Sequence, residues 1–324
     1  MENQSSELPA AAHGLQSVPR PPKIVTHGGR SRAIRFRNFS FFVLLLSLLF
    51  VRPLADLVAL GLASKIHSHI LLIPFTFAYL IYVQLDHLPS KSSISIGWSI
   101  PPLLIGGGIL ALAFSLPGFS ASANPSNHLA LTILAFVCFI AVGGLILLGM
   151  GWMRALSFPF AFLIFFVPLP DEIIYRLEIA SQLASADAAQ AFFAVSGTPI
   201  LRDGMVFQLP GMVIRVAQEC SGIRSSRVLF ITSLEAAHMF LKSPWRRFLL
   251  VAFVIPLGIL RNGFRILVIG LLCVRYGPQM IDSVIHRQGG PVFFVLSLIP
   301  LFLLLWWLRR GEAKGAAADE RSGL

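Results

Sequence analysis

The stretch FLLVAFVIPLGILRNGFRILVIGLL, residues 248–272, is apolar along its length except around Arg261, Asn262 and Arg265. It is longer than the roughly 20 residues that an α-helix needs to cross the hydrocarbon core of a bilayer. Charged side chains inside such a segment are costly in lipid, so they are candidates for a functional site. This one stretch therefore predicts a membrane helix and also a place for chemistry within it.

The whole chain has the composition of a membrane protein. Of its 324 residues, 56% are hydrophobic and only 13% are charged, whereas a soluble domain averages about 25% charged residues. Long apolar segments recur from one end of the chain to the other. We expect an all-α, polytopic membrane protein of about eight transmembrane helices, with spans near residues 39–63, 70–85, 98–116, 129–150, 156–169, 220–240, 248–272 and 291–308.

The distribution of lysine and arginine orients these spans. With the N-terminus inside the cell, 15 basic residues fall on the inner side, six on the outer side and five within spans. The positive-inside rule favours this arrangement, and the basic loop 242–247 supports it most strongly. The net charge of +11 therefore reflects topology, and we expect no nucleic-acid partner. We divide the chain into a disordered basic cytoplasmic tail (1–37), a transmembrane domain (38–310) and a short cytoplasmic tail (311–324).

One long segment, 170–218, is expected outside the cytoplasm. From Asp171 to Val195 apolar residues recur at helical spacing, which predicts an amphipathic helix at the membrane interface. Its apolar positions include Ile174, Leu177, Ile179, Leu183 and Ala186. Gly197 should end the helix. The β-favouring residues between Ile200 and Val216 favour a short hairpin or an irregular lid over the site, and a plain loop fits them equally well.

The sequence ECSGIRSSR, residues 219–227, places Cys220 at the expected start of a span. The helix dipole favours an anion at such a position. If the helix runs from Cys220, Arg224 and Arg227 follow on the same face. Both effects would lower the pKa of the thiol and increase its thiolate fraction, although Glu219 acts in the opposite sense. Cys220 is thus a candidate nucleophile, with Arg224 and Arg227 in support.

Two further groups are expected at the same membrane surface. Arg261 and Arg265 share a helical face, with Asn262 beside them, and a guanidinium can donate hydrogen bonds to a developing oxyanion. A lone arginine can also reach the lipid headgroups, and this fits Arg265 better than Arg261. His286 precedes Arg287-Gln288-Gly289-Gly290, and histidine is well suited to proton transfer near neutral pH.

Other candidate groups receive structural interpretations. Cys138 and Cys273 lie in apolar runs and are expected to be small core residues. Ser221, Ser225 and Ser226 are expected to cap and pack helices, since no nucleophile-elbow motif surrounds them. No Cys/His spacing suggests a metal, so we expect no metal and no other cofactor. Several histidines besides His286 are interpreted as ordinary solvated side chains: His67, His69, His87, His128 and His238.

These motifs together resemble the exosortase/archaeosortase family. The resemblance rests on CSGIRS at 220–225, NGFR at 262–265 and HRQGG at 286–290, and also on FVPLP at 166–170 and the stretch from Gly197 to Pro210. It implies a multipass protein of the cytoplasmic membrane that cuts C-terminal sorting tails of exported proteins and passes them to an acceptor. In bacteria such a tail often has a Pro-Glu-Pro motif, a transmembrane helix and a basic cluster.

The resemblance also implies roles for single residues. Cys220 would be the nucleophile, Arg265 the transition-state donor and His286 the general acid or base, with His286 favouring the bacterial branch. The active site would face the extracytoplasmic side, and the partners would be tailed substrate proteins and the lipid bilayer. Two alternatives stay open from the residues alone. One is a transporter or polysaccharide-export component whose four arginines line an anion path, and the other is a structural membrane subunit; the oligomeric state is undetermined.

Overall fold

The computed structural model describes residues 27–64, 66–89, 93, 96–210, 212–216, 222–277, 279–280 and 290–322. Side chains are described in these ranges except for 27–31 and 315–322. Within them the protein is an all-α, polytopic membrane protein with one small sheet, as its composition predicted. Cys220 and His286 lie outside the described residues.

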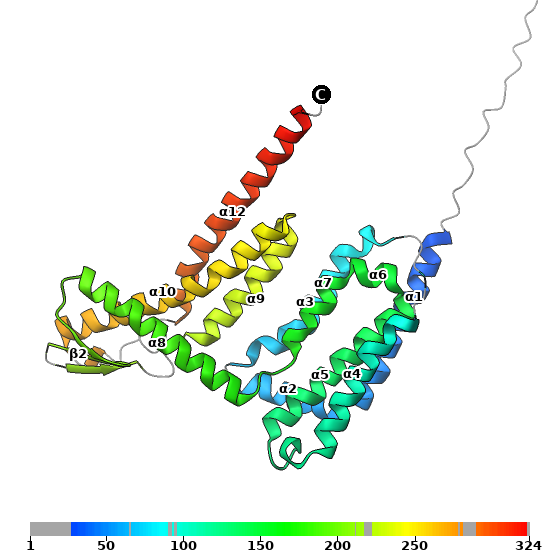
Figure 1. Ribbon diagram of the computed structural model, residues 1–324, viewed down its shortest axis with the longest axis horizontal. Coiled ribbons are helices and arrows are strands. Elements are labelled where there is room, and N and C mark those ends of the chain that lie inside the picture. The colour runs from blue at the N-terminus through cyan, green and yellow to red at the C-terminus, as the bar shows by residue number, and fades with distance from the viewer. Residues whose placement is uncertain are drawn as a thin grey trace, which may run out of the picture.

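The first half of the chain forms one bundle of helices, drawn from blue to green in Figure 1. Its core is rich in aromatic residues from several helices, including Phe39, Phe136, Trp152 and Phe162. Its elements are α1 (His27–Leu49), α2 (Val51–Ala63), η1 (Ser68–Leu72), α3 (Ile73–Gln84), η2 (Leu85–His87), α4 (Ile96–Ser115), η3 (Pro117–Phe119), α5 (Pro125–Gly143), the π-helical turn η4 (Gly144–Leu148), α6 (Met150–Ala155), α7 (Ser157–Phe162) and η5 (Leu163–Phe166).

The second half begins with a helix that starts near the lower end of the first bundle and runs away from it (Figure 1). Its elements are α8 (Asp171–Val195), β1 (Leu201–Asp203), β2 (Val206–Leu209), β3 (Met212–Arg215), α9 (Ile223–Phe240), α10 (Pro244–Tyr276) and α12 (Gly290–Ser322). Helices α9, α10 and α12 run side by side (Figure 1) and share a core that includes Leu229, Leu250 and Leu301. Helix α9 also joins the two halves, because its Ile231 belongs to the core of the first bundle.

By length and composition, five helices among the described residues can cross a membrane. They are Ser68–His87, Ile96–Ser115, Pro125–Leu148, Pro244–Tyr276 and Gly290–Lys314. Two bent helix pairs raise the number to seven if each is one span. The prediction of about eight counted α9 as a span, but its 18 residues include the charged side chains Arg224, Arg227 and Glu235.

The first predicted span, 39–63, is broken rather than straight. Helices α1 and α2 meet at Phe50 and the two axes differ by 83°. Pro53, in the first turn of α2, has no N–H and therefore cannot bond to the Leu49 carbonyl as a continuous helix would require. The predicted tail 1–37 is also partly wrong, because α1 already begins at His27, and Arg32 donates to the Leu88 carbonyl (2.9 Å).

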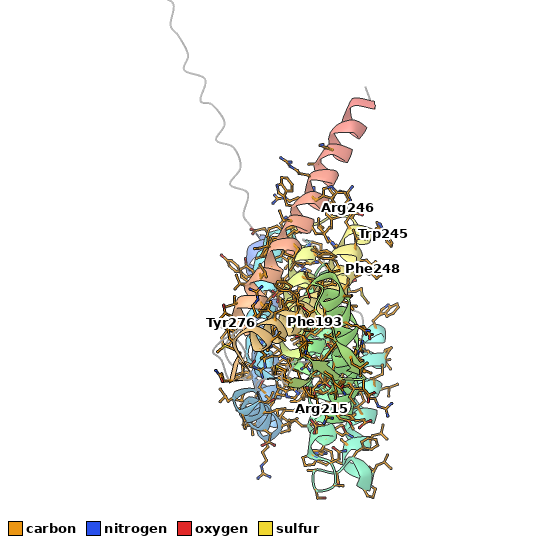
Figure 2. All side chains as sticks on the ribbon, turned by 90° about the vertical axis from the view of Figure 1, so that its left-hand side faces the viewer. Phe193, Arg215, Trp245, Arg246, Phe248 and Tyr276 are labelled. Atoms are coloured by element: carbon orange, nitrogen blue, oxygen red, sulfur yellow. The ribbon has the colours of Figure 1, made fainter. Side chains whose placement is uncertain are left out.

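The loops separate into two groups at opposite ends of the molecule. The N-terminal part of α1 and helix α6 lie at the upper end of Figure 1, as does the turn between α9 and α10. Arg35 of α1 donates to the Leu148 carbonyl, and Arg246 of α10 donates to the Leu308 carbonyl. Figure 2 shows Arg246 near this end and Arg215 nearer the opposite end. The segments at the upper end are those that the basic residues assign to the cytoplasm. The predicted alternation of loops thus agrees with the geometry, while the side that faces the cytoplasm rests on the charge rule.

The segment 170–218 contains the amphipathic helix and more strands than expected. Helix α8 spans Asp171–Val195, as predicted, and turns by 92° from the preceding helix. Gly197, with φ +70°, follows its end. Strands β1, β2 and β3 form an antiparallel three-stranded sheet, in which Phe207 pairs with Ile214. The sheet packs on α8 and α10 through Phe193, Phe207 and Ile266, among others.

Candidate active site

The start of α9 is the described position nearest to Cys220 along the chain. Gly222 is the N-cap of α9 and has φ +68°, a left-handed conformation that glycine adopts without steric cost. Consecutive α-carbons are about 3.8 Å apart, so the chain keeps the α-carbons of residues 220 and 222 within about 7.6 Å of each other. The contacts of Gly222 therefore show which side chains surround the cysteine-bearing segment.

The middle of α10 approaches Gly222 closely. A β-carbon on Gly222 would lie 3.1 Å from Nη2 of Arg261 and 3.1 Å from Cγ of Asn262. Both α10 residues are buried, with 8% and 2% of their surface exposed. The predicted motif on α10 and the chain that follows Cys220 are thus in contact, although they are about forty residues apart in sequence.

Arg261 holds the first turn of α9. Its Nη2 donates to the Gly222 carbonyl (3.2 Å) and to Oγ of Ser226 (3.2 Å). Its Nη1 is buried and has no hydrogen-bond partner among the described residues. Arg261 therefore does not extend to the lipid headgroups, as expected from the sequence, and it points toward the segment that carries Cys220.

Arg265 follows one helical turn after Arg261, about 6 Å further along the axis of α10. It is half-buried, and its charge acts on Arg261. At 100° per residue, Arg261, Asn262 and Arg265 occupy one sector of the helix about 100° wide. The structure thus brings these three predicted residues together, whereas the predicted meeting of Arg265 with Cys220 and His286 concerns residues outside the described ranges.

The positions of these side chains are set by glycines on α10. A β-carbon on Gly263 would lie 2.7 Å from the β-carbon of Ala188 and 3.0 Å from the backbone nitrogen of Ala189, so α8 rests directly on α10 here. A β-carbon on Gly258 would lie 2.7 Å from Oγ of Ser226 on α9. Helices α8 and α9 can approach α10 this closely only because both positions lack a side chain.

The predicted helical face shared by Cys220, Arg224 and Arg227 is wrong. Helix α9 begins at Ile223, and the left-handed Gly222 interrupts any helix that would start at Cys220. Arg224 is exposed. Arg227 turns away toward the first half of the chain, where its Nη1 donates to the Ile66 carbonyl (3.3 Å). Any support that Arg227 offers to the site therefore acts through the placement of α9.

Two histidines predicted to be solvated are instead packed between the two halves. His67 is 5% exposed, and its Nδ1 lies 3.2 Å from Oγ of Ser64. Burial, and then the positive charge of Arg227, lower the pKa of His67 below its usual value, which favours the neutral imidazole. His238 stacks on Phe158 with ring centroids 3.7 Å apart. Their environments depend on distant segments, which no local pattern of the sequence indicates.

The serines and cysteines behave as expected where they are described. Oγ of Ser225 donates to the Gly222 carbonyl (3.0 Å), and Ser226 accepts from Arg261. Cys138 and Cys273 are free thiols within the helical bundles, and Cys273 is 2% exposed. Within the described ranges, no three His, Cys, Asp or Glu side chains gather closely enough to hold a metal ion.

Helix α8 brings polar side chains to the same region, which no motif in the sequence indicates. Its buried face includes the apolar residues Ile174 and Ala186, but also Glu178, Gln182 and Ser185. Leu177 and Leu183, two other apolar positions of the predicted amphipathic helix, are 46% and 39% exposed. A helix at a membrane interface can turn leucines toward lipid and polar groups toward an interior cavity, so its apolar pattern does not identify its buried face.

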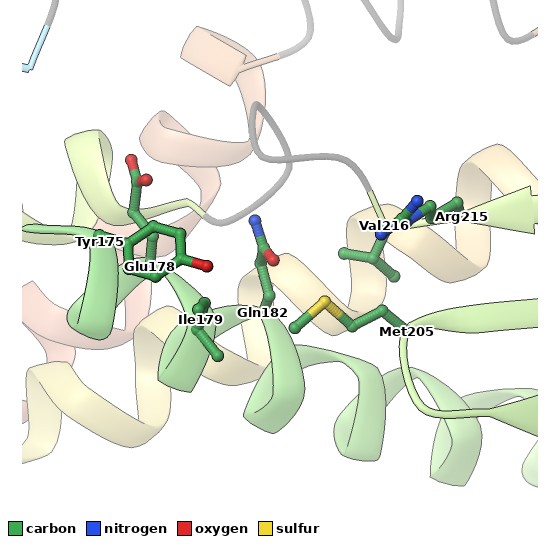
Figure 3. A pocket seen from close by; sticks show the side chains of 7 residues that line it. All are labelled: Tyr175, Glu178, Ile179, Gln182, Met205, Arg215 and Val216. Carbon is green, nitrogen blue, oxygen red and sulfur yellow. The ribbon is translucent and has the colours of Figure 1, made fainter.

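A cavity of about 340 Å³ lies between α8 and the end of β3. Figure 3 shows Glu178 and Gln182 rising from α8 on the side where Val216 and Arg215 form the opposite wall. Val216 is the last described residue before the segment that carries Cys220. The cavity and the Gly222 contacts therefore flank this segment, one at each of its ends.

Comparison with known proteins identifies a family. A family model described as transmembrane exosortase matches residues 62–303, which is well over half of the chain and includes every predicted site residue. No curated protein matches the chain. No solved structure matches it either.

Proposed function

Because the chain belongs to the transmembrane exosortase family, we propose that it is a membrane-embedded cysteine peptidase or transpeptidase in which Cys220 is the nucleophile. The observation that carries the proposal is the contact of Gly222 with Arg261 and Asn262. It joins the segment that bears Cys220, the one cysteine besides Cys138 and Cys273, to the sector of α10 that bears Arg265.

The proposed chemistry is covalent catalysis on a peptide bond. The Cys220 thiolate attacks the scissile carbonyl, and its sulfur forms a new bond to the carbonyl carbon. Arg265 donates hydrogen bonds to the oxyanion that develops. His286 protonates the leaving amine as the carbon–nitrogen bond breaks, which leaves a thioester on Cys220. Water or an acceptor amine then attacks the thioester and regenerates the thiol.

The proposed substrates are exported proteins held in the membrane by a C-terminal sorting tail, as the family resemblance implies. The cleavage would take place at the outer face of the cytoplasmic membrane. The distribution of basic residues supports this placement of the cleavage. It assigns the loop 242–247 to the inside, and therefore assigns the opposite end of the molecule, with α8 and the sheet, to the outside. An enzyme placed there meets its substrates after their export.

The test is substrate processing in cells that express Cys220→Ala at the wild-type level, with Cys273→Ala as the matched control. The C-terminal peptides of membrane proteins are compared by mass spectrometry. We expect proteins with intact C-terminal tails to accumulate with Cys220→Ala and not with Cys273→Ala, since Cys273 is a buried core thiol. Equal processing by both variants would reject the enzyme and favour the transporter alternative.

A further inference from the structure

The buried face of α8 carries a row of polar side chains beside the proposed active site. Glu178, Gln182 and Ser185 are 4%, 7% and 0% exposed, and Tyr175 continues the row at the outer end of the cavity. Their spacing of three and four residues places all four on one side of the helix. A helix that served only for packing would bury its leucines here, but Leu177 and Leu183 face outward instead.

Two members of this row have hydrogen-bonding capacity that the described residues do not use. Gln182 forms no hydrogen bond within the described ranges, and Oγ of Ser185 is buried there without a partner. The Gln182 amide lines the cavity and is left open to it, so a molecule bound there can supply its hydrogen-bond partners. The side chain of Gln182 lines the cavity together with Glu178 and Arg215 (Figure 3). These groups therefore point to a polar ligand.

The geometry of the row suits an extended peptide. Four residues of helix rise about 6 Å, which separates Glu178 from Gln182 along α8. An extended chain presents equivalent backbone groups every two residues, about 6.6 Å apart. A glutamine amide can both donate to a peptide carbonyl and accept from a peptide N–H, while a carboxylate accepts from a further N–H. The cavity, at about 340 Å³, is within the range of ligand sites and much larger than one ion or water needs.

We propose that this cavity is a subsite for the extended backbone of the substrate next to the scissile bond, with Gln182 and Glu178 as its hydrogen-bonding residues. Arg215, on the opposite wall, donates to a carbonyl or carboxylate of the same segment. The proposal rests on the proposed function, since the cavity ends at Val216 and the chain continues from there to Cys220. It assigns substrate binding to α8, a helix that carries none of the motifs on which the family resemblance rests.

The test uses the full-length protein and a peptide copied from a tail whose processing in cells requires Cys220. Gln182→Met keeps the volume of the side chain and removes its hydrogen bonds. The control is Gln190→Met on the exposed face of the same helix, where Oε1 of Gln190 accepts from Nη1 of Arg202. We expect Gln182→Met to raise KM about 3- to 10-fold, the effect of one neutral hydrogen bond. The rate at which iodoacetamide alkylates Cys220 should not change.

An ester scan of the peptide identifies the backbone N–H that donates a hydrogen bond to Gln182. Each backbone amide near the scissile bond is replaced in turn by an ester, which removes one N–H donor. At one position the ester should weaken cleavage by the wild-type protein and by Gln190→Met about 3- to 10-fold, yet have little further effect on Gln182→Met. If no position distinguishes Gln182→Met from the wild type, the subsite assignment is wrong while the proposed function stands.

A second measurement covers the case in which Gln182→Met does not fold. The photo-crosslinker p-benzoylphenylalanine replaces Ile179, which lines the cavity, or Leu183, which faces outward, in a Cys220→Ala background. We expect substrate crosslinks from position 179 and not from 183; equal yields would overturn the subsite. If the wild-type protein cleaves no tailed peptide, the proposed function itself is wrong. An inactive wild type thus distinguishes failure of the proposed function from failure of the subsite assignment, in which the wild type remains active.

Discussion

At the scale of single residues, two arginines that lie one turn apart on α10 differ in their contacts and burial. Arg261 donates hydrogen bonds to the Gly222 carbonyl and to Oγ of Ser226, so it positions the start of α9. Arg265 is half-buried and carries the same charge one turn nearer the proposed outer face. An oxyanion donor must lie beside the reacting carbonyl with its N–H groups directed at it. Of the two, Arg265 is the proposed donor and Arg261 a positioning residue.

This division predicts different responses to lysine. Arg265→Lys should reduce turnover by about 10²–10³, because an ammonium lacks the planar fork of donors that stabilises an oxyanion. Arg261→Lys should lose less, since one ammonium can still donate to the Gly222 carbonyl. The measurement is the single-turnover rate of purified variants in equal folded amounts. A larger loss in Arg261→Lys than in Arg265→Lys would show that the roles are reversed.

At the scale of secondary-structure elements, the site depends on the contact between α8 and α10. Gly263 touches Ala188 and the backbone of Ala189, and it lies between Asn262 and Arg265 in the motif. The contact fixes the rotation of α10, and thereby the direction in which its polar residues point. It also sets the polar row of α8 beside the same segment.

Gly263→Ala should therefore destabilise the protein, because a new β-carbon 2.7 Å from Ala188 and 3.0 Å from the Ala189 backbone forces the helices apart. Overpacking of this kind typically costs about 1–3 kcal/mol. Gly107→Ala on α4 is the matched control, since a β-carbon there meets nothing within 4 Å. Thermal unfolding in detergent would measure both. Equal melting temperatures would contradict the packing at Gly263.

At the scale of the whole molecule, the loop that contains Ile66 and His67 in the first half packs against α9 of the second half through polar groups. Arg227 of α9 donates to the Ile66 carbonyl, and the neighbouring His67 is buried. Residues of α3 and α7 continue the contact further along α9, where His238 stacks on Phe158. The position of α9, and hence of Gly222 at its start, thus depends on both halves of the chain.

The burial of His67 at this contact predicts that the stability of the protein depends on pH. Burial and Arg227 lower the pKa of His67 in the folded state, so the unfolded chain binds a proton more readily. Stability should accordingly be full above the usual histidine pKa of about 6.5 and should fall as the pH drops below it. The melting temperature of His67→Gln should change less between pH 7.5 and 5.5 than that of the wild type. A wild-type melting temperature that rises on acidification would contradict this.

Topology gives the last prediction at this scale. A single cysteine introduced at Ser243, in a variant without the three native cysteines, should be protected from an impermeant maleimide in intact cells and should react after permeabilisation. The basic residues around it favour the inside. A cysteine introduced at Ser196, after α8, should react in intact cells. Labelling at Ser243 from outside would invert the topology and remove the proposed active site from the outer face.

The sequence alone determined the class of this protein, the order of its loops and the family to which it belongs. These properties depend on local quantities: runs of apolar residues, lysines and arginines at their ends, and short motifs such as NGFR at 262–265. The sequence also predicts the bounds of α8, because Pro170 and the acidic first turn mark the start of a helix and Gly197 marks its end.

Only the tertiary structure decided which faces of the helices meet. Gly222 is left-handed, so Arg224 and Arg227 do not continue a helix from Cys220, and the arginine nearest to that segment comes instead from α10. Leu177 and Leu183 of α8 are exposed, while Glu178 and Gln182 are buried beside the cavity. Hydrophobic periodicity reports that a helix has two faces, but only its neighbours decide which face is buried.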